Sequence, residues 1–168
     1  NYRGQLPLAE VEARITRHWH PYHRALRQLI EDTHARFGKA ILIDCHSMPH
    51  EAIEHHARPG TLAPDVVLGD RFGASAAPWV TKAVEAAFVA QGFRVAHNTP
   101  FAGAFIAQSY GRPSAGRHVV QVEVDRSLYM DESRIEPLPG FADFARRIDA
   151  VVAQLSAIGA QGLPLAAE

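Results

Sequence analysis

The sequence predicts an α/β protein whose helices cover both faces of a sheet. Short, continuous apolar segments alternate along the chain with longer segments in which apolar residues recur every three or four positions. The first pattern is typical of buried strands and the second of amphipathic helices. One further segment, His118–Arg126, alternates apolar and polar residues as a strand does. Together these patterns predict a three-layer α/β sandwich.

The first predicted helix runs from Pro7 to Phe37, because apolar residues follow a helical repeat throughout this segment. Pro21 has no N–H to donate, so we expect the helix to kink or split near His20. Gly38 is expected to end it, since glycine adopts the left-handed conformation of a helix C-terminus at little cost.

Four segments are predicted to be strands of one sheet. They are Ala40–Asp44, Val66–Leu68, Arg94–Ala96 and Val119–Val124. Two more helices are expected, one over Pro78–Gln91 and a final one that begins at Pro137 or Pro139. The segments Pro49–Pro64 and Pro100–Gly116 are interpreted as a polar loop and as a strand or loop pair packed near the site.

Composition narrows the class of protein. Of the 168 residues 47% are hydrophobic and 21% charged, which predicts one globular domain over residues 1–158 and a frayed tail over residues 159–168. A formal net charge of −1 argues against a nucleic-acid-binding protein, and no apolar run is long enough to span a membrane. Cys45 is the single cysteine, which excludes an internal disulfide and favours a reducing, cytoplasmic location. Nothing in the sequence predicts an oligomeric state.

Ten histidines are the unusual feature of this composition, and they raise the expectation of metal chemistry. His23 lies on the apolar face of the first predicted helix, where a buried, hydrogen-bonded core histidine is favoured over a ligand. His18 and His20 are expected to face solvent. The same is expected of His55 and His56, because adjacent residues on a loop make weak metal ligands.

The best candidate for a site follows the apolar run Ala40–Ile43. Asp44 and His46 are two residues apart, so they point to the same side of a strand, at the end where α/β sheets bind ligands. An imidazole beside a carboxylate suits a metal ligand or a general base, although a structural histidine that closes the strand is equally compatible. Cys45 should point the other way. A serine or cysteine hydrolase is disfavoured, because neither Cys45 nor Ser47 lies in a nucleophile-elbow motif.

A second candidate lies on the alternating strand, which presents valines on one side and Gln121, Glu123 and Asp125 on the other. At the edge of a sheet these polar residues would simply be hydrated. In the middle of a sheet, a buried Glu123 would need a hydrogen-bond partner or a function.

Several segments resemble one family, the N-formylglutamate amidohydrolases (N-formylglutamate deformylases). The matching segments are HPYHRAL, DCHSMP, PDVVLGDRFG, NTPFAGAFI with the following YGRP, and VVQVEVDRSLYMDE, in the family's order between Trp19 and Glu132. The resemblance implies a central mixed sheet of the zinc-carboxypeptidase-like (phosphorylase/hydrolase-like) type. It also implies a zinc-dependent amidohydrolase that cleaves N-formyl-L-glutamate to formate and L-glutamate in histidine degradation.

The resemblance assigns roles to five residues. His46 would be a ligand of one zinc ion, and Glu123 would be the general base on the metal-bound water. Arg71 and Arg126 would bind the carboxylates of the substrate, and Asn98 would orient its backbone. For Arg71, Arg126 and Asn98, an equally weighted alternative is that they form surface or structural ion pairs.

The sequence departs from the family pattern at one point. The family's proline-histidine-glycine strand end, which supplies the first metal ligand with a nearby acidic residue, does not occur in it. We therefore expect the other zinc ligands in an N-terminal part that precedes this sequence, and the chain alone to be inactive. Two alternatives stay open: a related N-acyl or N-formyl amino-acid hydrolase, and an inactive homologue that holds a small dicarboxylate with its arginines.

Overall fold

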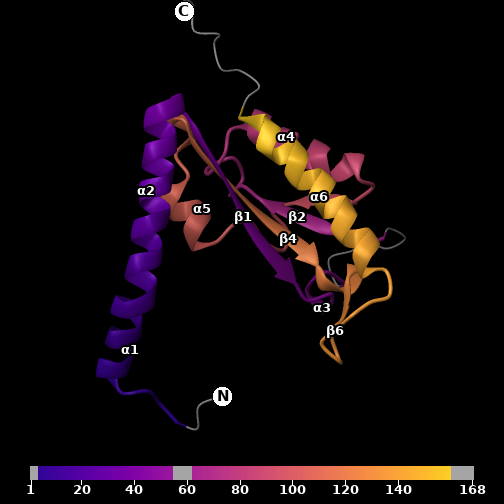
Figure 1. Cartoon of the computed structure of the whole chain (residues 1–168), viewed down its shortest axis with the longest axis horizontal. Coiled ribbons are helices and arrows are strands. Elements are labelled where there is room, and N and C mark those ends of the chain that lie inside the picture. The colour runs from indigo at the N-terminus through magenta and orange to yellow at the C-terminus, as the bar shows by residue number, and fades with distance from the viewer. Residues whose placement is uncertain (1–3, 55–61, 160–168) are drawn as a thin grey trace, which may run out of the picture.

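The computed structural model describes residues 4–54 and 62–159, and in this part of the chain four strands form a mixed sheet (Figure 1). The strands lie in the order β1-β4-β2-β3. Their bounds are Ala40–Met48 for β1, Val66–Gly69 for β2, Val95–His97 for β3 and Arg117–Asp125 for β4. All four predicted segments are therefore strands of one sheet, as expected.

The two longest strands, β1 and β4, pair in parallel over their full length, from Ala40 opposite Arg117 to Met48 opposite Asp125. Strand β2 runs antiparallel to β4 and parallel to β3. Because β4 has neighbours on both sides, its polar residues are buried and not merely hydrated.

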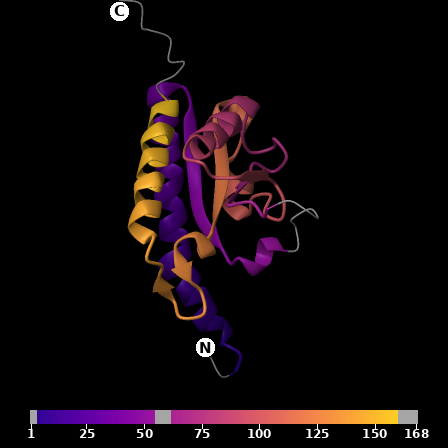
Figure 2. The same cartoon turned by 90° about the vertical axis from the view of Figure 1, so that its right-hand side faces the viewer.

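One face of the sheet is covered by α4 (Pro78–Ala90) and α6 (Phe141–Ile158), as Figures 1 and 2 show. Valines of β2 and β4 form the main hydrophobic core with residues of these two helices. Its largest fully buried members are Val66, Leu68, Val80, Val84, Val120, Val122 and Val151. The valines of β4 therefore face this core, as the alternation of the strand predicted.

The other face is covered by α2 (His20–Phe37), α5 (Phe105–Tyr110) and the short α3 (Glu51–Glu54). Two smaller hydrophobic clusters lie here. One consists of Ile30, Ala40, Ala107, Tyr110 and Val119, and the other of Met48, Ile53 and Val67. Strand alternation puts the polar residues of β1 and β4 on this same face, between the two clusters. Helices thus cover both faces, as the predicted layering requires.

The first predicted helix is present, but a π-helical turn divides its α-helical part in two. It consists of α1 (Leu8–Arg14), a π-helical turn η1 (Ile15–Trp19) and α2, which follow one another without a break (Figure 1). Pro21 cannot donate a backbone hydrogen bond, and just before it the His20 N–H donates to the carbonyl of Ile15, five residues back. Gly38 ends the helix with φ 69°, as predicted.

The apolar residues of α1 do not contribute to the core. No residue of α1 is buried, and the Leu8 side chain is 73% exposed. A helical repeat shows that one side of a helix is apolar, but it does not say what covers that side. No helix in the described ranges has the length and apolarity that crossing a bilayer requires.

Three expectations about segments were wrong. The segment read as a polar loop contains α3, and the segment read as a strand or loop pair contains α5. The last helix begins at Phe141, after the two prolines proposed as its start. Pro137 instead belongs to β6 (Glu136–Pro137), which pairs with β5 (Met130–Asp131). The last helix therefore begins only after this strand pair.

We predict that Gly69→Ala destabilises the protein, because the added Cβ would lie 2.5 Å from the backbone nitrogen of Gly103. Backbone atoms cannot move aside as a flexible side chain can, so the free energy of unfolding should fall by about 1–3 kcal/mol or more. Urea unfolding followed by circular dichroism measures this change. Gly159→Ala is the matched control, because nothing lies within 4 Å of its added Cβ. Equal stability of both variants would contradict the close backbone approach.

Candidate active site

The candidate site lies where the parallel strands β1 and β4 end. Strand register places His46 opposite Glu123 and Asp44 opposite Gln121. Within β1, Nε2 of His46 is 3.1 Å from Oδ1 of Asp44, so the two side chains share one side of the strand, as predicted. The His46 side chain is 47% exposed, whereas Glu123 is only 7% exposed. An accessible imidazole therefore lies beside a buried carboxyl group.

Gln121 holds the carboxyl group of Glu123 in place. Its Nε2 donates to Oε1 of Glu123 at 2.8 Å, and its Oε1 accepts from the backbone N–H of Ala104 at 2.8 Å. The Ala104 bond fixes which end of the Gln121 amide faces Glu123. Within the described ranges, Oε2 of Glu123 has no hydrogen-bond partner. One carboxyl oxygen is thus held while the other is available to accept a proton.

The environment of Glu123 suits a general base. Burial raises the pKa of Glu123 above its usual range. The charge of His46, the hydrogen bond from Gln121 and the charge of Arg126 oppose this shift, while the carboxylate of Asp44 adds to it. A base works best when its pKa approaches the working pH, so a raised pKa favours proton abstraction. Glu123 is buried, so the alternative that it is simply a hydrated residue on an edge strand is wrong.

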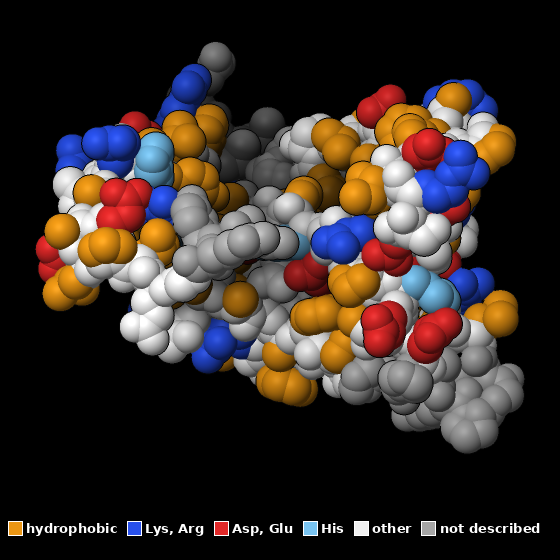
Figure 3. Space-filling view, turned by 90° about the horizontal axis from the view of Figure 1, so that it is seen from below, with side chains coloured by type: hydrophobic (Ala, Val, Ile, Leu, Met, Phe, Trp, Pro, Cys, Tyr) orange, Lys and Arg blue, Asp and Glu red, His pale blue; other side chains and the backbone are white. Residues whose placement is uncertain are grey.

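Arg126 follows β4 directly and lies against the end of β1. Its Nε donates to Oγ of Ser47 at 3.1 Å, and its Nη2 donates to the Ser47 carbonyl at 3.2 Å. Its Nη1 is 3.7 Å from Oε2 of Glu132. These contacts orient the guanidinium and make it part of a structural network. Its binding of a substrate carboxylate stays a prediction. Figure 3, which views the molecule from the end toward which β1 points, shows basic, acidic and histidine side chains together on this face.

Arg71 and Asn98 form a second group. Because β2 runs antiparallel to β4, its last residue, Gly69, lies opposite Gln121, and the turn that follows points away from the His46 end. In this turn Arg71 has φ 54°, its N–H donates to Ala102 at 2.7 Å and its Nη1 donates to Gly103 at 3.3 Å. The structure therefore divides the predicted site residues between two places.

Asn98 braces the turn that carries Arg71. Its Nδ2 donates to Oδ1 of Asp70 at 2.8 Å, and its Oδ1 accepts from the N–H groups of Asp70 and Phe72 at 3.1 and 3.2 Å. Asp70 also accepts from the Thr81 hydroxyl at 2.9 Å. These contacts support a positioning role for Asn98. That Asn98 orients the backbone of a substrate stays a prediction.

The two groups are linked through residues 102–104. Arg71 bonds to this segment from one side, and the N–H of Ala104 bonds to Gln121 on the other. Polar contacts consequently run from the Arg71 turn through Gln121 to Glu123.

Burial raises the pKa of Asp70, but hydrogen bonds from Asn98, the Gly73 N–H and Thr81 outweigh this and leave its pKa below the usual range. A carboxyl group with a lowered pKa stabilises the fold when ionised. That stabilisation is present above the unfolded-state pKa of about 3.9 and is lost as the pH falls through the folded-state pKa.

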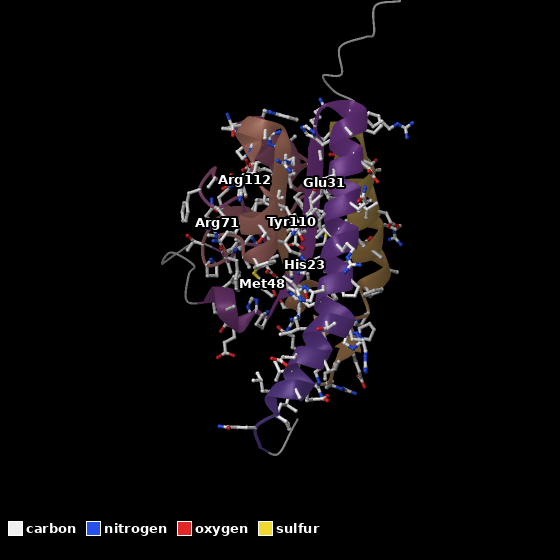
Figure 4. All side chains as sticks on the ribbon, turned by 90° about the vertical axis from the view of Figure 1, so that its left-hand side faces the viewer. His23, Glu31, Met48, Arg71, Tyr110 and Arg112 are labelled. Atoms are coloured by element: carbon white, nitrogen blue, oxygen red, sulfur yellow. The ribbon has the colours of Figure 1, made fainter. Side chains whose placement is uncertain are left out.

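The other histidines agree with the predictions where the structure describes them. His23 is 8% exposed and its Nδ1 lies 2.7 Å from the Tyr110 hydroxyl, so it is a buried, hydrogen-bonded core residue (Figure 4). His18 and His20 are exposed. His55 and His56 lie outside the described residues.

Sequence reasoning missed a cluster around Asp125, which includes His50. Nδ1 of His50 and Oγ of Ser127 both lie 2.8 Å from Oδ2 of Asp125. The hydrogen bond to Asp125 raises the pKa of His50 despite partial burial, and the charges of Asp125, Glu54 and Glu132 add to the shift. No sequence motif signals this cluster, because it joins residues from distant parts of the chain. Gln121, by contrast, could have been identified from its position on the polar side of β4.

The described residues do not form a zinc site by themselves. No three of their histidine, cysteine, aspartate or glutamate side chains are grouped so as to hold a metal ion. His46 is an accessible donor, but a catalytic zinc usually has three protein ligands. A complete zinc site would need donors from outside these residues.

The fold and site together define an α/β protein with a buried glutamate beside an accessible histidine at the ends of two parallel strands. The family model described as N-formylglutamate amidohydrolase matches residues 1–130. The chain therefore belongs to the N-formylglutamate amidohydrolase family, as the resemblance predicted.

Similar proteins are known from three bacteria. The N-formylglutamate deformylase of Pseudomonas aeruginosa is 36% identical over 154 residues, which cover 90% of this chain and 56% of that protein. The N-formylglutamate deformylase of Pseudomonas putida is 34% identical with the same coverage. The crystal structure of N-formylglutamate amidohydrolase from Ralstonia eutropha matches with a TM-score of 0.81 and 37% identity, covering 92% of this chain and 55% of that one. The chain thus spans about half the length of these relatives.

We predict that Asn98→Gly destabilises the protein at neutral pH by about 1–3 kcal/mol, because Asp70 and Phe72 lose their hydrogen-bond partner. Glycine tolerates the φ of 58° at this position, so the loss contains no left-handed backbone strain. The pKa of Asp70 should rise, which carboxyl NMR titration can measure alongside urea unfolding.

Asn98→Ala is the matched comparison. It should cost about 1–2 kcal/mol more than Asn98→Gly, because alanine is strained in the left-handed region. Unchanged stability of Asn98→Gly would show that the side chain does not brace the turn.

Proposed function

We propose that this chain is part of an amidohydrolase that cleaves N-formyl-L-glutamate to formate and L-glutamate. The observation that carries the proposal is the placement of Glu123, buried and held by Gln121, next to the accessible His46. The names of the relatives support the same reaction. A cytoplasmic location, a role in histidine degradation and a likeness to zinc carboxypeptidases belong to the proposal as well.

The chemistry that this chain's own residues offer is proton transfer. Oε2 of Glu123 would accept a proton from a water molecule as the water oxygen bonds to the formyl carbon. The carboxyl group would then return the proton to the amide nitrogen as the C–N bond breaks, which yields formate and a free amine. Gln121 keeps the carboxyl group oriented throughout.

Substrate binding would rely on the arginines. Arg126 lies on the Glu123 side, where Ser47 orients its guanidinium for a carboxylate of the substrate. Arg71 is held by its strained turn and by Gly103. Both assignments stay proposals.

A zinc ion belongs to the proposal only as a group that would activate the water and polarise the formyl oxygen when bound. His46 is the proposed ligand. Because the described residues lack a complete ligand set, we assign no step to the metal in this chain.

The incomplete set of metal ligands among the described residues favours a second candidate function, an inactive homologue that binds a small dicarboxylate. A third, a hydrolase of another N-formyl or N-acyl amino acid, differs only in the side chain it accepts. Isothermal titration with N-formyl-L-glutamate, together with formate release from a panel of N-formyl amino acids, separates the three. Both measurements are made on the whole protein of which this chain is proposed to be part, and binding without hydrolysis there would support the inactive homologue.

We predict that, in the whole amidohydrolase of which this chain is proposed to be part, Glu123→Gln lowers formate release about 10²–10⁴-fold while the fold is kept, because the amide preserves the shape but cannot accept the proton. Glu136→Gln is the control, since Glu136 is exposed and its carboxylate pairs with the nearby Arg134. Formate is quantified enzymatically, and circular dichroism checks the fold. Full turnover by Glu123→Gln would refute the proposed base.

We further predict that the Glu123 carboxyl group, followed by ¹³C NMR, titrates above the usual range of glutamate. As a base it must be ionised, so turnover should fall as the pH drops below this raised pKa. His46→Gln should raise the pKa further, because the charge of His46 favours the ionised form. Gln121→Leu should act in the same direction by removing the hydrogen bond. A lower pKa in either variant would contradict this account of the site.

A further inference from the structure

A polar groove lies between α2 and α5, on the face of the sheet opposite α4 and α6. Its volume is about 550 Å³, a size typical of small-molecule sites. His23 lines it toward one end of α2, and Glu31 and Arg112 line it toward the other (Figure 4). The rings of Trp19 and Phe105 lie beside His23 and line the groove as well. None of the residues placed at the candidate active site lines this groove.

The groove carries an excess of positive charge. Four arginines line it, Arg24 and Arg27 from α2 and Arg112 and Arg117 from the opposite wall, against the single carboxylate of Glu31. Within the described ranges, Arg24 and Arg27 form neither ion pairs nor hydrogen bonds through their side chains. Unneutralised guanidinium groups on two facing walls attract a ligand with negative charge at both ends.

The second wall is rigidly built. The backbones of Arg112 and Arg117 form a β-bridge, with N–H···O distances of 2.7 and 3.1 Å. Arg112 is fixed further by hydrogen bonds from its Nη1 to the carbonyls of Gln108 and Gly111. Two positively charged residues are thereby held on paired backbone positions, which favours an anion beside them.

Arg117 has an unmet hydrogen-bonding need. Its Nε is buried and, among the described residues, has no acceptor. A buried donor without a partner is costly, and such groups are normally paired in a native protein. A carboxylate in the groove would supply the missing acceptor and would form the two-pronged contact that arginine favours.

The Arg117 end of this groove is distant from Glu123. Arg117 begins β4 and Glu123 lies six residues further along the same strand, which is about 20 Å at ~3.3 Å per residue. A small N-formyl amino acid at Glu123 would not reach Arg117. The excess of arginines therefore needs an explanation beyond the proposed reaction.

We propose that the groove is a second binding site, which takes a small dicarboxylate. The two facing pairs of arginines favour a ligand with two separated carboxylates over a compact anion such as phosphate, which would engage one wall only. The site is independent of whether Glu123 acts as a base.

The test is isothermal titration of this chain at low salt with glutarate, butyrate and inorganic phosphate. Glutarate should bind more than tenfold tighter than butyrate, which has one carboxylate, and than phosphate. Arg117→Gln and Arg27→Gln should each weaken glutarate binding at least tenfold. Arg117→Lys keeps the charge but loses the buried Nε, so it should weaken binding as well.

Two further variants give the test its controls. Arg146→Gln removes an exposed arginine on α6 that pairs with Asp143, and it should leave binding unchanged. Arg126→Gln removes the proposed carboxylate binder on the Glu123 side and should leave glutarate binding unchanged, so failure of the proposed reaction and failure of this site are distinguishable. Circular dichroism checks that each variant is folded.

Glutarate binding that persists in Arg117→Gln and Arg27→Gln would overturn the proposal, as would absence of glutarate binding to the unaltered chain. Phosphate that binds as tightly as glutarate would overturn the assignment to a dicarboxylate. Binding of glutarate lost in Arg126→Gln but kept in Arg117→Gln would place the ligand at the candidate active site instead.

Discussion

The structure depends on the parallel pairing of β1 with β4. This ladder extends from Ala40 to Met48 without a slip, and a shift by one residue would turn His46 and Glu123 to opposite faces of the sheet. Valines on one side of β4 anchor the register in the main core, while smaller clusters fix it on the other side. The polar residues are thus positioned by the packing of their apolar neighbours.

A second constraint acts through backbone contacts at the middle of the sheet. Gly69 allows the segment 101–103 to lie directly against the end of β2, and this contact brings the N–H of Ala104 to Gln121. The orientation of the Glu123 carboxyl group therefore depends on a loop and a glycine that never touch it. The carboxyl group is therefore oriented jointly by the close packing at Gly69 and by the hydrogen bonds that link Ala104 to Gln121 and Gln121 to Glu123.

Local patterns predicted the strands, the pairing of Asp44 with His46 and the buried side of β4, because alternation is a property of neighbouring residues. They did not predict α5, which has six residues between glycine-rich segments. They could not show that β2 runs antiparallel to β4, which separates Arg71 from Glu123. The roles of Gln121 and Asn98 depend on which distant backbone groups face them, and a single sequence does not contain that information.

The contact of His50 with Asp125 ties the segment after β1 to the end of β4. The pKa of His50 is raised in the folded chain, mainly by this hydrogen bond. Proton binding and folding are therefore linked: the contribution is complete below the unfolded-state pKa of about 6.5 and disappears as the pH rises through the higher folded-state pKa. Loss of the His50 proton above its raised folded-state pKa would weaken the junction next to the candidate site while the valine core keeps its packing.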